Sequence, residues 1–184
     1  MIKNTETSYG LVAKLLHWLS ALVIIFMFGL GLYMMDLSYG HPYEKSSLSL
    51  HQSIGMSFFI LWTVRLIWKF LNLSPKLAQA DSTIKKLENF AAHAVHGLLY
   101  VMMFIMLFSG YLLAITDGAG SSFTFFGLFE VPSLGEFFEE RADIAGLIHE
   151  KMAWALIVLA GLHGLAALKH HFIDKDDTLR KMTR

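Results

Sequence analysis

Histidines within apolar stretches are the residues of this chain best suited to chemistry. His149 and His163 lie 14 residues apart in the apolar C-terminal segment 145–172. At about 100° and 1.5 Å per residue, this interval leaves two side chains about 40° apart around a helix and about 21 Å apart along it. One helix face therefore carries two imidazoles, one near each edge of a hydrocarbon layer of about 30 Å. Because a histidine inside a membrane is costly and usually functional, the spacing predicts two stacked cofactors.

The composition indicates a membrane protein without thiol chemistry. Hydrophobic residues make up 55% of the 184 residues and charged residues 16%, whereas soluble domains usually have about 25% charged residues. The chain has no cysteine, which excludes disulfides, iron–sulfur ligation and covalent attachment of c-type haem. Any haem must therefore be non-covalent and b-type. The 15 basic and 15 acidic residues balance, so the composition has no excess of basic residues that would indicate nucleic-acid binding.

Four segments are apolar and reach the roughly 20 residues that a membrane-spanning helix needs. They cover approximately residues 14–35, 50–71, 90–115 and 145–172. The sequence therefore predicts an all-α membrane protein, a four-transmembrane-helix bundle with residues 1–184 in a single domain. The first segment is expected to be a retained helix, because its apolar run is longer than the roughly 7–15 residues of a signal-peptide core.

The positions of Lys and Arg predict the orientation. Most of the 15 basic residues lie in the N-terminus, in the link between the second and third spans, and in the C-terminus. The opposite side keeps only Lys45, Arg141 and Lys151. By the positive-inside rule, both termini are expected to be cytoplasmic.

The remaining connection, residues 117–148, is expected to be an acidic outer loop. Its length of 32 residues predicts some structure of its own. Ser133 and Glu136 have the spacing of a capping box, which predicts a short helix there. Asp81 or Ser82 is similarly expected to cap the helix that enters the third span.

This orientation gives each intramembrane histidine a depth, and the depths match in pairs. His17 lies towards the inner end of the first span with His163 of the fourth, and we call these two the inner pair. His51 lies towards the outer end of the second span with His149, and these form the outer pair. Two neutral imidazoles that face each other from adjacent helices suit a six-coordinate haem iron. The sequence therefore predicts two haem b groups, each with two histidine ligands.

Arg65 follows His51 by the same interval of 14 residues, which places it near the inner haem. A guanidinium there can pair with a propionate carboxylate, although an ordinary positive-inside anchor fits the position equally well. Gly55 and Gly146 flank the outer ligands, where a porphyrin face needs room.

Other histidines have weaker assignments. His93 and His96 begin the third span, three residues apart, and fit either packing at the interface or contact with an inner propionate or a quinone headgroup. His170 and His171 are expected in a solvated or headgroup environment beyond the inner pair. His41 is expected at the surface.

Several motifs resemble the bacterial cytochrome b561 family over nearly the whole chain. They are His17-Trp18-Leu19, His51-Gln-Ser-Ile-Gly55, the two histidines of the fourth span, and the tail from Lys169 to Arg180. The resemblance implies a dihaem b-type cytochrome of the bacterial inner membrane, with the inner and outer pairs as iron ligands and ubiquinone as redox partner. One branch is associated with a periplasmic isoprenoid-binding, lipocalin-like partner. One relative oxidises superoxide, an anion that an acidic outer loop would repel.

The function expected from these observations is electron relay across or within the inner membrane, between the quinone pool and a periplasmic redox partner. One alternative is the membrane-anchor cytochrome of a hydrogenase or formate dehydrogenase. Another is a histidine-lined divalent-metal transporter, although Asp and Glu are absent from the middle of the four spans. A purely structural bundle leaves the depth-matched histidines unexplained.

Overall fold

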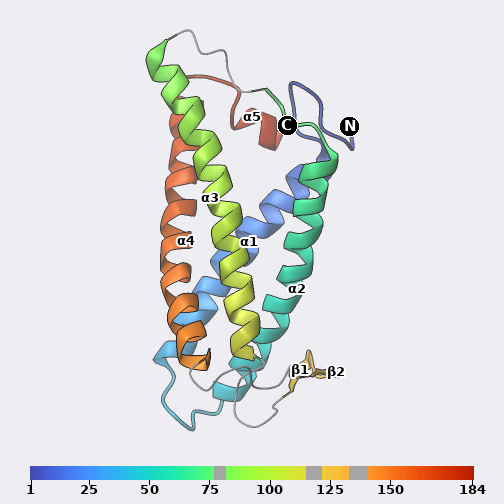
Figure 1. The fold of residues 1–184 in the computed structure, drawn as a ribbon, viewed down its shortest axis with the longest axis vertical. Helices are drawn as coiled ribbons and strands as arrows, with labels where there is room; N and C mark the ends of the chain where they lie inside the picture. Colours follow the sequence, from blue (N-terminus) through green and yellow to red (C-terminus); the bar gives the residue numbers. More distant parts are fainter. Residues whose placement is uncertain (77–81, 115–121, 133–140) are drawn as a thin grey trace. The chain divides into compact units, whose positions relative to one another are not determined.

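The computed structural model of the protein describes residues 1–76, 82–114, 122–132 and 141–184. Figure 1 shows the elements that these residues form. In chain order they are α1 (Leu11–Asp36), α2 (Glu44–Leu71), α3 (Thr83–Ala114), β1 (Phe123–Phe125), β2 (Phe129–Val131), α4 (Arg141–Phe172) and α5 (Arg180–Thr183).

The four long helices correspond to the four predicted spans. Each is long and apolar enough to cross a membrane, with a mean hydropathy between 1.5 and 2.2 in its most apolar part. α2 and α3 begin before their apolar runs, because polar residues form their first turns. Glu44 opens α2, and the Ser82 hydroxyl caps α3 by accepting a hydrogen bond from the Lys85 amide at 3.2 Å. The prediction that Asp81 or Ser82 caps this helix is therefore confirmed for Ser82.

The contacts between residues divide the chain into two compact units. Unit 1 comprises residues 1–21, 61–101 and 158–184, and unit 2 comprises residues 22–60 and 102–157. Each of the four long helices contributes residues to both units. The expectation of a single domain remains a prediction. The inner pair belongs to unit 1 and the outer pair to unit 2, so each histidine pair is described within its own unit.

In unit 1 the two ends of the chain are joined by hydrogen bonds. The Tyr9 amide donates to the Lys181 carbonyl at 3.4 Å, and the Trp18 indole donates to the Met182 carbonyl at 3.0 Å. Figure 1 shows the N- and C-termini beside α5. The short terminal helix is therefore held against the segment of α1 that carries His17.

Unit 1 also contains an ion-paired cluster that the sequence did not predict. The Lys169 ammonium lies 2.5 Å from a Glu88 oxygen and 2.8 Å from Asp174 Oδ2. His170 Nδ1 lies 2.9 Å from the same Asp174 oxygen and 3.1 Å from Asp176 Oδ2. His170 is expected in a solvated or headgroup environment, and the structure adds that two carboxylates flank its ring. Glu88, His170 and Asp174 have the spacing of metal ligands, but the Lys169 ammonium already supplies the cation for both carboxylates.

In unit 2 the β1–β2 hairpin is structure that the all-α prediction missed. Its strands are antiparallel, with Phe123 opposite Val131. The turn places Phe126 at φ 47° and Gly127 at φ 73°, the positive-φ pair that a tight hairpin requires. The connection thus has structure of its own, as its length predicted. The helix predicted at Ser133 to Glu136 lies outside the described residues.

Candidate functional site

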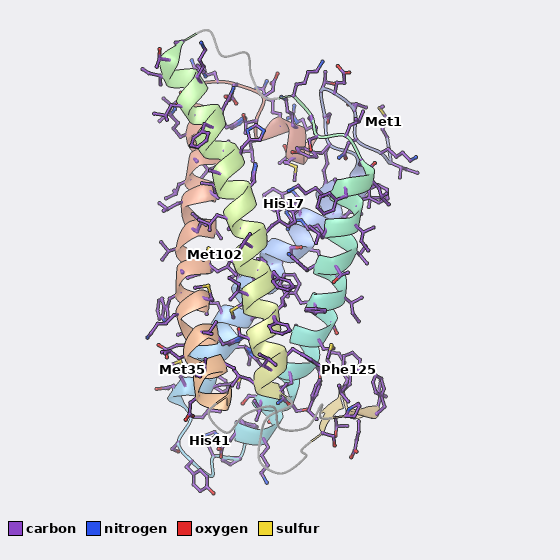
Figure 2. All side chains as sticks on the ribbon, in the orientation of Figure 1. Met1, His17, Met35, His41, Met102 and Phe125 are labelled. Atoms are coloured by element: carbon purple, nitrogen blue, oxygen red, sulfur yellow. The ribbon has the colours of Figure 1, made fainter. Side chains whose placement is uncertain are left out.

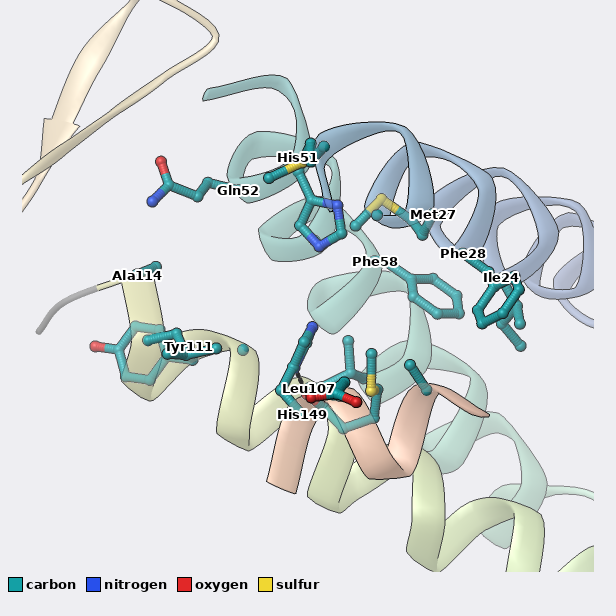
Figure 3. Close-up of a pocket in the computed structure, with 18 of the residues that line it drawn as sticks. Ile24, Met27, Phe28, His51, Gln52, Phe58, Leu107, Tyr111, Ala114 and His149 are labelled. Atoms are coloured by element: carbon teal, nitrogen blue, oxygen red, sulfur yellow. Dashed lines mark hydrogen bonds between the residues drawn. The ribbon is translucent and has the colours of Figure 1, made fainter. Parts of the chain in front are cut away.

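The outer pair lies in a cavity within unit 2. His51 comes from α2 and His149 from α4, and Figure 3 shows the two rings pointing toward one another. Their centroids are 6.2 Å apart and their planes differ by 72°. Both line the same cavity, whose volume is about 520 Å³. The depth matching predicted from the sequence therefore brings these two residues together.

The ring separation is the one that a shared metal ion requires. A metal–imidazole bond is about 2.0 Å, and a ring nitrogen stands about 1.1 Å from the ring centre, so two coaxial ligands place their centres about 6.2 Å apart. The observed 6.2 Å matches this sum. A direct hydrogen bond between the rings would bring the centroids closer. The two imidazoles are thus spaced as two ligands of one metal ion would be.

The remainder of the cavity wall is almost entirely apolar. Its lining includes Met27, Phe28, Phe58, Met103, Leu107, Phe123 and Trp154. Four glycines also line the cavity, and their lack of side chains leaves space around the histidines. They are Gly31, Gly55, Gly110 and Gly146. Gly55 and Gly146 were predicted to leave room for a macrocycle, and both border this cavity. An apolar volume that encloses two convergent imidazoles fits a non-covalent haem.

His149 is held in place by residues of α3. Its Nδ1 lies 3.1 Å from the Met106 carbonyl and 3.2 Å from the Ser109 hydroxyl. A carbonyl can only accept, so Nδ1 carries the proton and Nε2 keeps its lone pair for a metal. A Cβ atom at Gly110 would stand 2.7 Å from His149 Cε1, so the absence of a side chain there lets the ring lie against α3. No sequence pattern indicates Met106 and Ser109, because their role depends on the contact between α3 and α4.

His51 has a different environment. Its Nδ1 is buried and has no hydrogen-bond partner among the residues that the structure describes. A Cβ atom at Gly31 would lie 3.9 Å from its Cε1. In contrast to His149, no hydrogen bond to its Nδ1 fixes the orientation of the His51 ring in the described part of the chain.

The inner pair in unit 1 has the same spacing. His17 from α1, labelled in Figure 2, and His163 from α4 have ring centroids 6.2 Å apart and planes that differ by 71°. The separation again equals that of two imidazoles on one iron. The second predicted pairing is thus reproduced in the geometry of the described residues.

Arg65 lies beside the inner pair, as its position in the sequence predicted. One guanidinium nitrogen is 2.9 Å from His17 Nδ1. Because guanidinium only donates, His17 Nδ1 accepts this hydrogen bond and the ring proton is on Nε2. The Arg65 guanidinium also lies 5.5 Å from the Tyr100 ring centroid, and the Lys69 ammonium lies 4.0 Å from it. Two cations are therefore held by one aromatic ring near His17, an arrangement not predicted from the sequence.

His93 and His96, which were predicted either to pack at the interface or to contact an inner propionate or quinone, have different surroundings. His96 lies beside the inner pair, with its ring centroid 5.1 Å from that of His163. This separation is shorter than two iron bonds require, so His96 and His163 cannot share an iron as an axial pair. His93 bonds to the Asn89 carbonyl of its own helix at 2.8 Å, which is the packing role. His41 lies in the connection before α2 and contacts Tyr43.

Comparison with known proteins identifies the family of the chain. Residues 8–184 match the family described as prokaryotic cytochrome b561. The chain is 40% identical over 179 residues to cytochrome b561 homolog 2 of Escherichia coli strain K12, covering 97% of this chain and 93% of that protein. It is 28% identical to the probable superoxide oxidase CybB of Yersinia pestis, with 91% and 90% coverage. It is 29% identical to Escherichia coli cytochrome b561 homolog 1, with 91% and 92% coverage.

These matches extend over nearly the whole length of the chain and of each relative. The four apolar helices and the bacterial relatives make it a multi-pass protein of the bacterial inner membrane. The family binds b-type haem and transfers electrons. The chain belongs to the prokaryotic cytochrome b561 family, and it is a membrane-bound electron-transfer cytochrome b.

Proposed function

We propose that this cytochrome carries two haem b groups, one between His17 and His163 and one between His51 and His149, and relays electrons between them. The observation that carries the proposal is the repeated 6.2 Å separation of the two histidine pairs. Each bound haem supplies a one-electron iron couple. With two histidines available to hold each haem, the protein would relay electrons and would leave no iron position open for a substrate.

The four histidines have the same proposed role, but the residues that hydrogen-bond to their rings differ. The Met106 carbonyl and the Ser109 hydroxyl fix the orientation of His149. His17 can bind iron through Nε2 only when its proton lies on Nδ1, and Arg65 then has to release that nitrogen. A propionate carboxylate is the partner that suits the released guanidinium. The position of Arg65 beside the inner pair, 2.9 Å from His17 Nδ1, supports its assignment as a propionate contact.

We propose that the inner pair lies on the cytoplasmic side, because the basic residues concentrate in the segments of unit 1. Both termini are then cytoplasmic. The proposed redox partner on at least one side is a membrane quinone, ubiquinone in the family that the chain resembles, with a periplasmic redox protein on the other. An isoprenoid-binding, lipocalin-like protein is the periplasmic partner implied by the resemblance.

The superoxide oxidation named for the Yersinia relative is not part of the proposal. Residues 117–148 contain one basic residue before Ile148, Arg141, against six acidic residues: Asp117, Glu130, Glu136, Glu139, Glu140 and Asp143. A negative outer surface repels an anionic substrate and slows its encounter. A neutral quinol or a protein donor is compatible with this charge.

The test is haem quantification on the purified protein and on single histidine variants. We expect two haems per chain, and we expect His149→Ala and His163→Ala to retain one haem each. His93→Ala serves as the matched control and should keep two, because among the described residues the His93 side chain bonds to the Asn89 carbonyl of its own helix. Loss of both haems from either single variant, in protein with an unchanged helical circular-dichroism spectrum, would contradict the pairing. Copurification of an iron–sulfur subunit would instead favour the membrane-anchor role.

A further inference from the structure

We propose that the β1–β2 hairpin is a lipid-binding element that lies at the membrane surface beside the outer pair, with its turn among the acyl chains. The partner is the bilayer itself, at the boundary between phospholipid headgroups and acyl chains. The inference concerns a surface outside both histidine pairs, so it is independent of the number of haems. All the residues that support it belong to unit 2.

The two faces of the hairpin differ in polarity. One face is formed by apolar residues of both strands: Phe123, Phe125, Phe129 and Val131. The other face is polar, with Thr124 opposite Glu130. On this face the Ser122 hydroxyl donates a hydrogen bond to the Glu130 carboxylate at 3.1 Å. An element with one apolar and one charged face suits the boundary between acyl chains and water.

The apolar side chains at the turn are largely uncovered by the protein. Leu128 is 77% exposed and Phe129 is 56% exposed, and Phe126 is exposed as well. The Phe125 ring centroid lies 4.8 Å from that of Phe126 and 5.1 Å from that of Phe129, so the three rings form one cluster. Exposed apolar side chains that are contiguous in this way mark an interaction surface.

The attachment of the hairpin to α2 indicates how deep the turn lies. The Phe126 amide donates to the Ser53 hydroxyl at 2.9 Å, and Ser53 lies three residues inside the apolar run of α2 that begins at Leu50. Three residues correspond to about 4.5 Å along a helix. Interfacial elements bury their apolar faces to a similar depth, roughly 5–10 Å. The turn is therefore level with the outermost part of the acyl chains.

The neighbouring surface of α2 faces lipid as well. Leu50 and Ile60 lie three residues before and seven residues after Ser53, which places them on the same face of the helix. Both are exposed, and an exposed apolar residue of a membrane-spanning helix contacts acyl chains. Figure 1 shows the hairpin beside the first turns of α2. The exposed turn thus continues the lipid-facing surface of this helix.

The backbone of the turn also suits an apolar environment, in which an amide without an acceptor is costly. The Phe126 amide bonds to Ser53, and the Leu128 amide donates to the Phe125 carbonyl at 2.9 Å. Glu130 is exposed, and its charge is strongly disfavoured among acyl chains. The carboxylate therefore keeps the polar face of the hairpin at the headgroups while the turn enters the lipid.

The first experiment measures how fast a charged, water-soluble maleimide alkylates single thiols of the protein in phosphatidylcholine nanodiscs. Because the chain has no cysteine, Leu128→Cys and Thr124→Cys each introduce one reactive thiol. Both positions are exposed in the protein, so without lipid contact their rates would be similar. We expect Leu128→Cys to react at least about tenfold more slowly than the Thr124→Cys control, because apolar surroundings suppress the thiolate. After unfolding in dodecyl sulfate, both should react alike.

The second experiment uses the unsubstituted protein in nanodiscs of a phosphatidylcholine that carries a photoactivatable diazirine in its acyl chain. We expect lipid adducts on Phe126, Leu128 or Phe129, identified by mass spectrometry of the digested protein. Phe104, an exposed residue of α3, is the positive control within a membrane span.

Equal alkylation rates in Leu128→Cys and Thr124→Cys would overturn the inference, because the two faces of the hairpin would then have the same surroundings. Slow alkylation of Leu128→Cys without lipid adducts on the hairpin would also overturn it, because a second copy or another part of the protein would then cover the turn. Haem content enters neither measurement, so a failure of this inference is distinguishable from a failure of the proposed function.

Discussion

The His149 ring lies so close to Gly110 that a Cβ atom on this glycine would stand 2.7 Å from Cε1 of the imidazole. Four residues earlier on the same face of α3, the Met106 carbonyl accepts the proton of His149 Nδ1. Gly110 and the Met106 carbonyl thus act on the same ring. Gly110 leaves the space in which the His149 ring lies, and the Met106 carbonyl determines its tautomer. A histidine held in this way presents a lone pair to the cavity before any metal binds, which reduces the ordering cost of ligation.

Gly110→Ala is therefore expected to displace His149 and to weaken haem binding at the outer pair, while the inner pair keeps its haem. Haem per chain should fall from two towards one after purification. Gly29→Ala is the matched control, because it lies in the same unit with open space around its Cβ position. Both substitutions raise helix propensity by roughly 0.5–1 kcal/mol, so their difference isolates the contact with His149. Equal haem content in the two variants would mean that the ring has room to shift.

The sequence was sufficient to predict the four spans and both histidine pairs, because helix geometry and membrane thickness together fix the depth of a residue on a spanning helix. Depth alone does not give azimuth, so it could not reveal that Ser109 and Gly110 of α3 face His149, nor that His96 lies beside His163.

The hairpin was missed for a different reason. The run Phe123 to Val131 has strand-forming aromatic residues on either side of a Phe-Gly turn, but the charge and length of the connection do not by themselves predict a hairpin. A strand pattern this short is weak when Phe126, and not Asn or Asp, occupies the first positive-φ position.

Carbon monoxide is expected to leave the reduced absorption spectrum nearly unchanged. Each proposed iron has an imidazole on both faces, so a diatomic ligand has to displace a histidine first. The measurement is a difference spectrum of the dithionite-reduced protein before and after addition of carbon monoxide. His149→Ala is expected to keep only the inner haem and should therefore also respond little to carbon monoxide. A large response in this variant would mean that the remaining haem is the outer one. A large shift in the unsubstituted protein would show that one coordination position is open.

The C-terminal ion-pair cluster is expected to give stability that depends on pH. The hydrogen bond from Lys169 lowers the pKa of Asp174 below its ordinary value of 3.8. A group whose pKa is lower in the folded state contributes stability above its unfolded pKa, and that contribution is lost as pH falls through the folded value. Asp174→Asn should therefore lower the thermal midpoint near pH 7, and the difference from the unsubstituted protein should shrink below pH 4.

Asp177→Asn is the control for this effect, because Asp177 is 70% exposed and pairs with Arg180 at 3.4 Å. An exposed pair of this kind contributes little stability, so its thermal midpoint should follow that of the unsubstituted protein at every pH. A pH-independent loss of stability in Asp174→Asn would indicate a packing defect in place of the lost ion pair.

Ser53 is expected to fasten the β1–β2 hairpin to the helix that carries His51. Its side chain is fully buried. Its hydroxyl donates to the Ser49 carbonyl at 2.8 Å and accepts from the Phe126 amide at 2.9 Å. Ser53→Ala leaves that amide without its acceptor, at a cost of about 1–3 kcal/mol if the site stays dry. Because Phe123 of β1 lines the outer cavity, release of the hairpin should also open that cavity.

The measurement is hydrogen exchange in residues 122–132, together with the rate at which a water-soluble reductant reduces the outer haem. Both should increase in Ser53→Ala. Ser57→Ala is the matched control, because the Ser57 hydroxyl bonds at 2.9 Å to a carbonyl of its own helix and not to the hairpin. If the hairpin in Ser53→Ala exchanges no faster than in Ser57→Ala, the strands are held by their own aromatic contacts, such as Phe125 against Phe129 at 5.1 Å. The bond to Ser53 would then align the hairpin without fastening it.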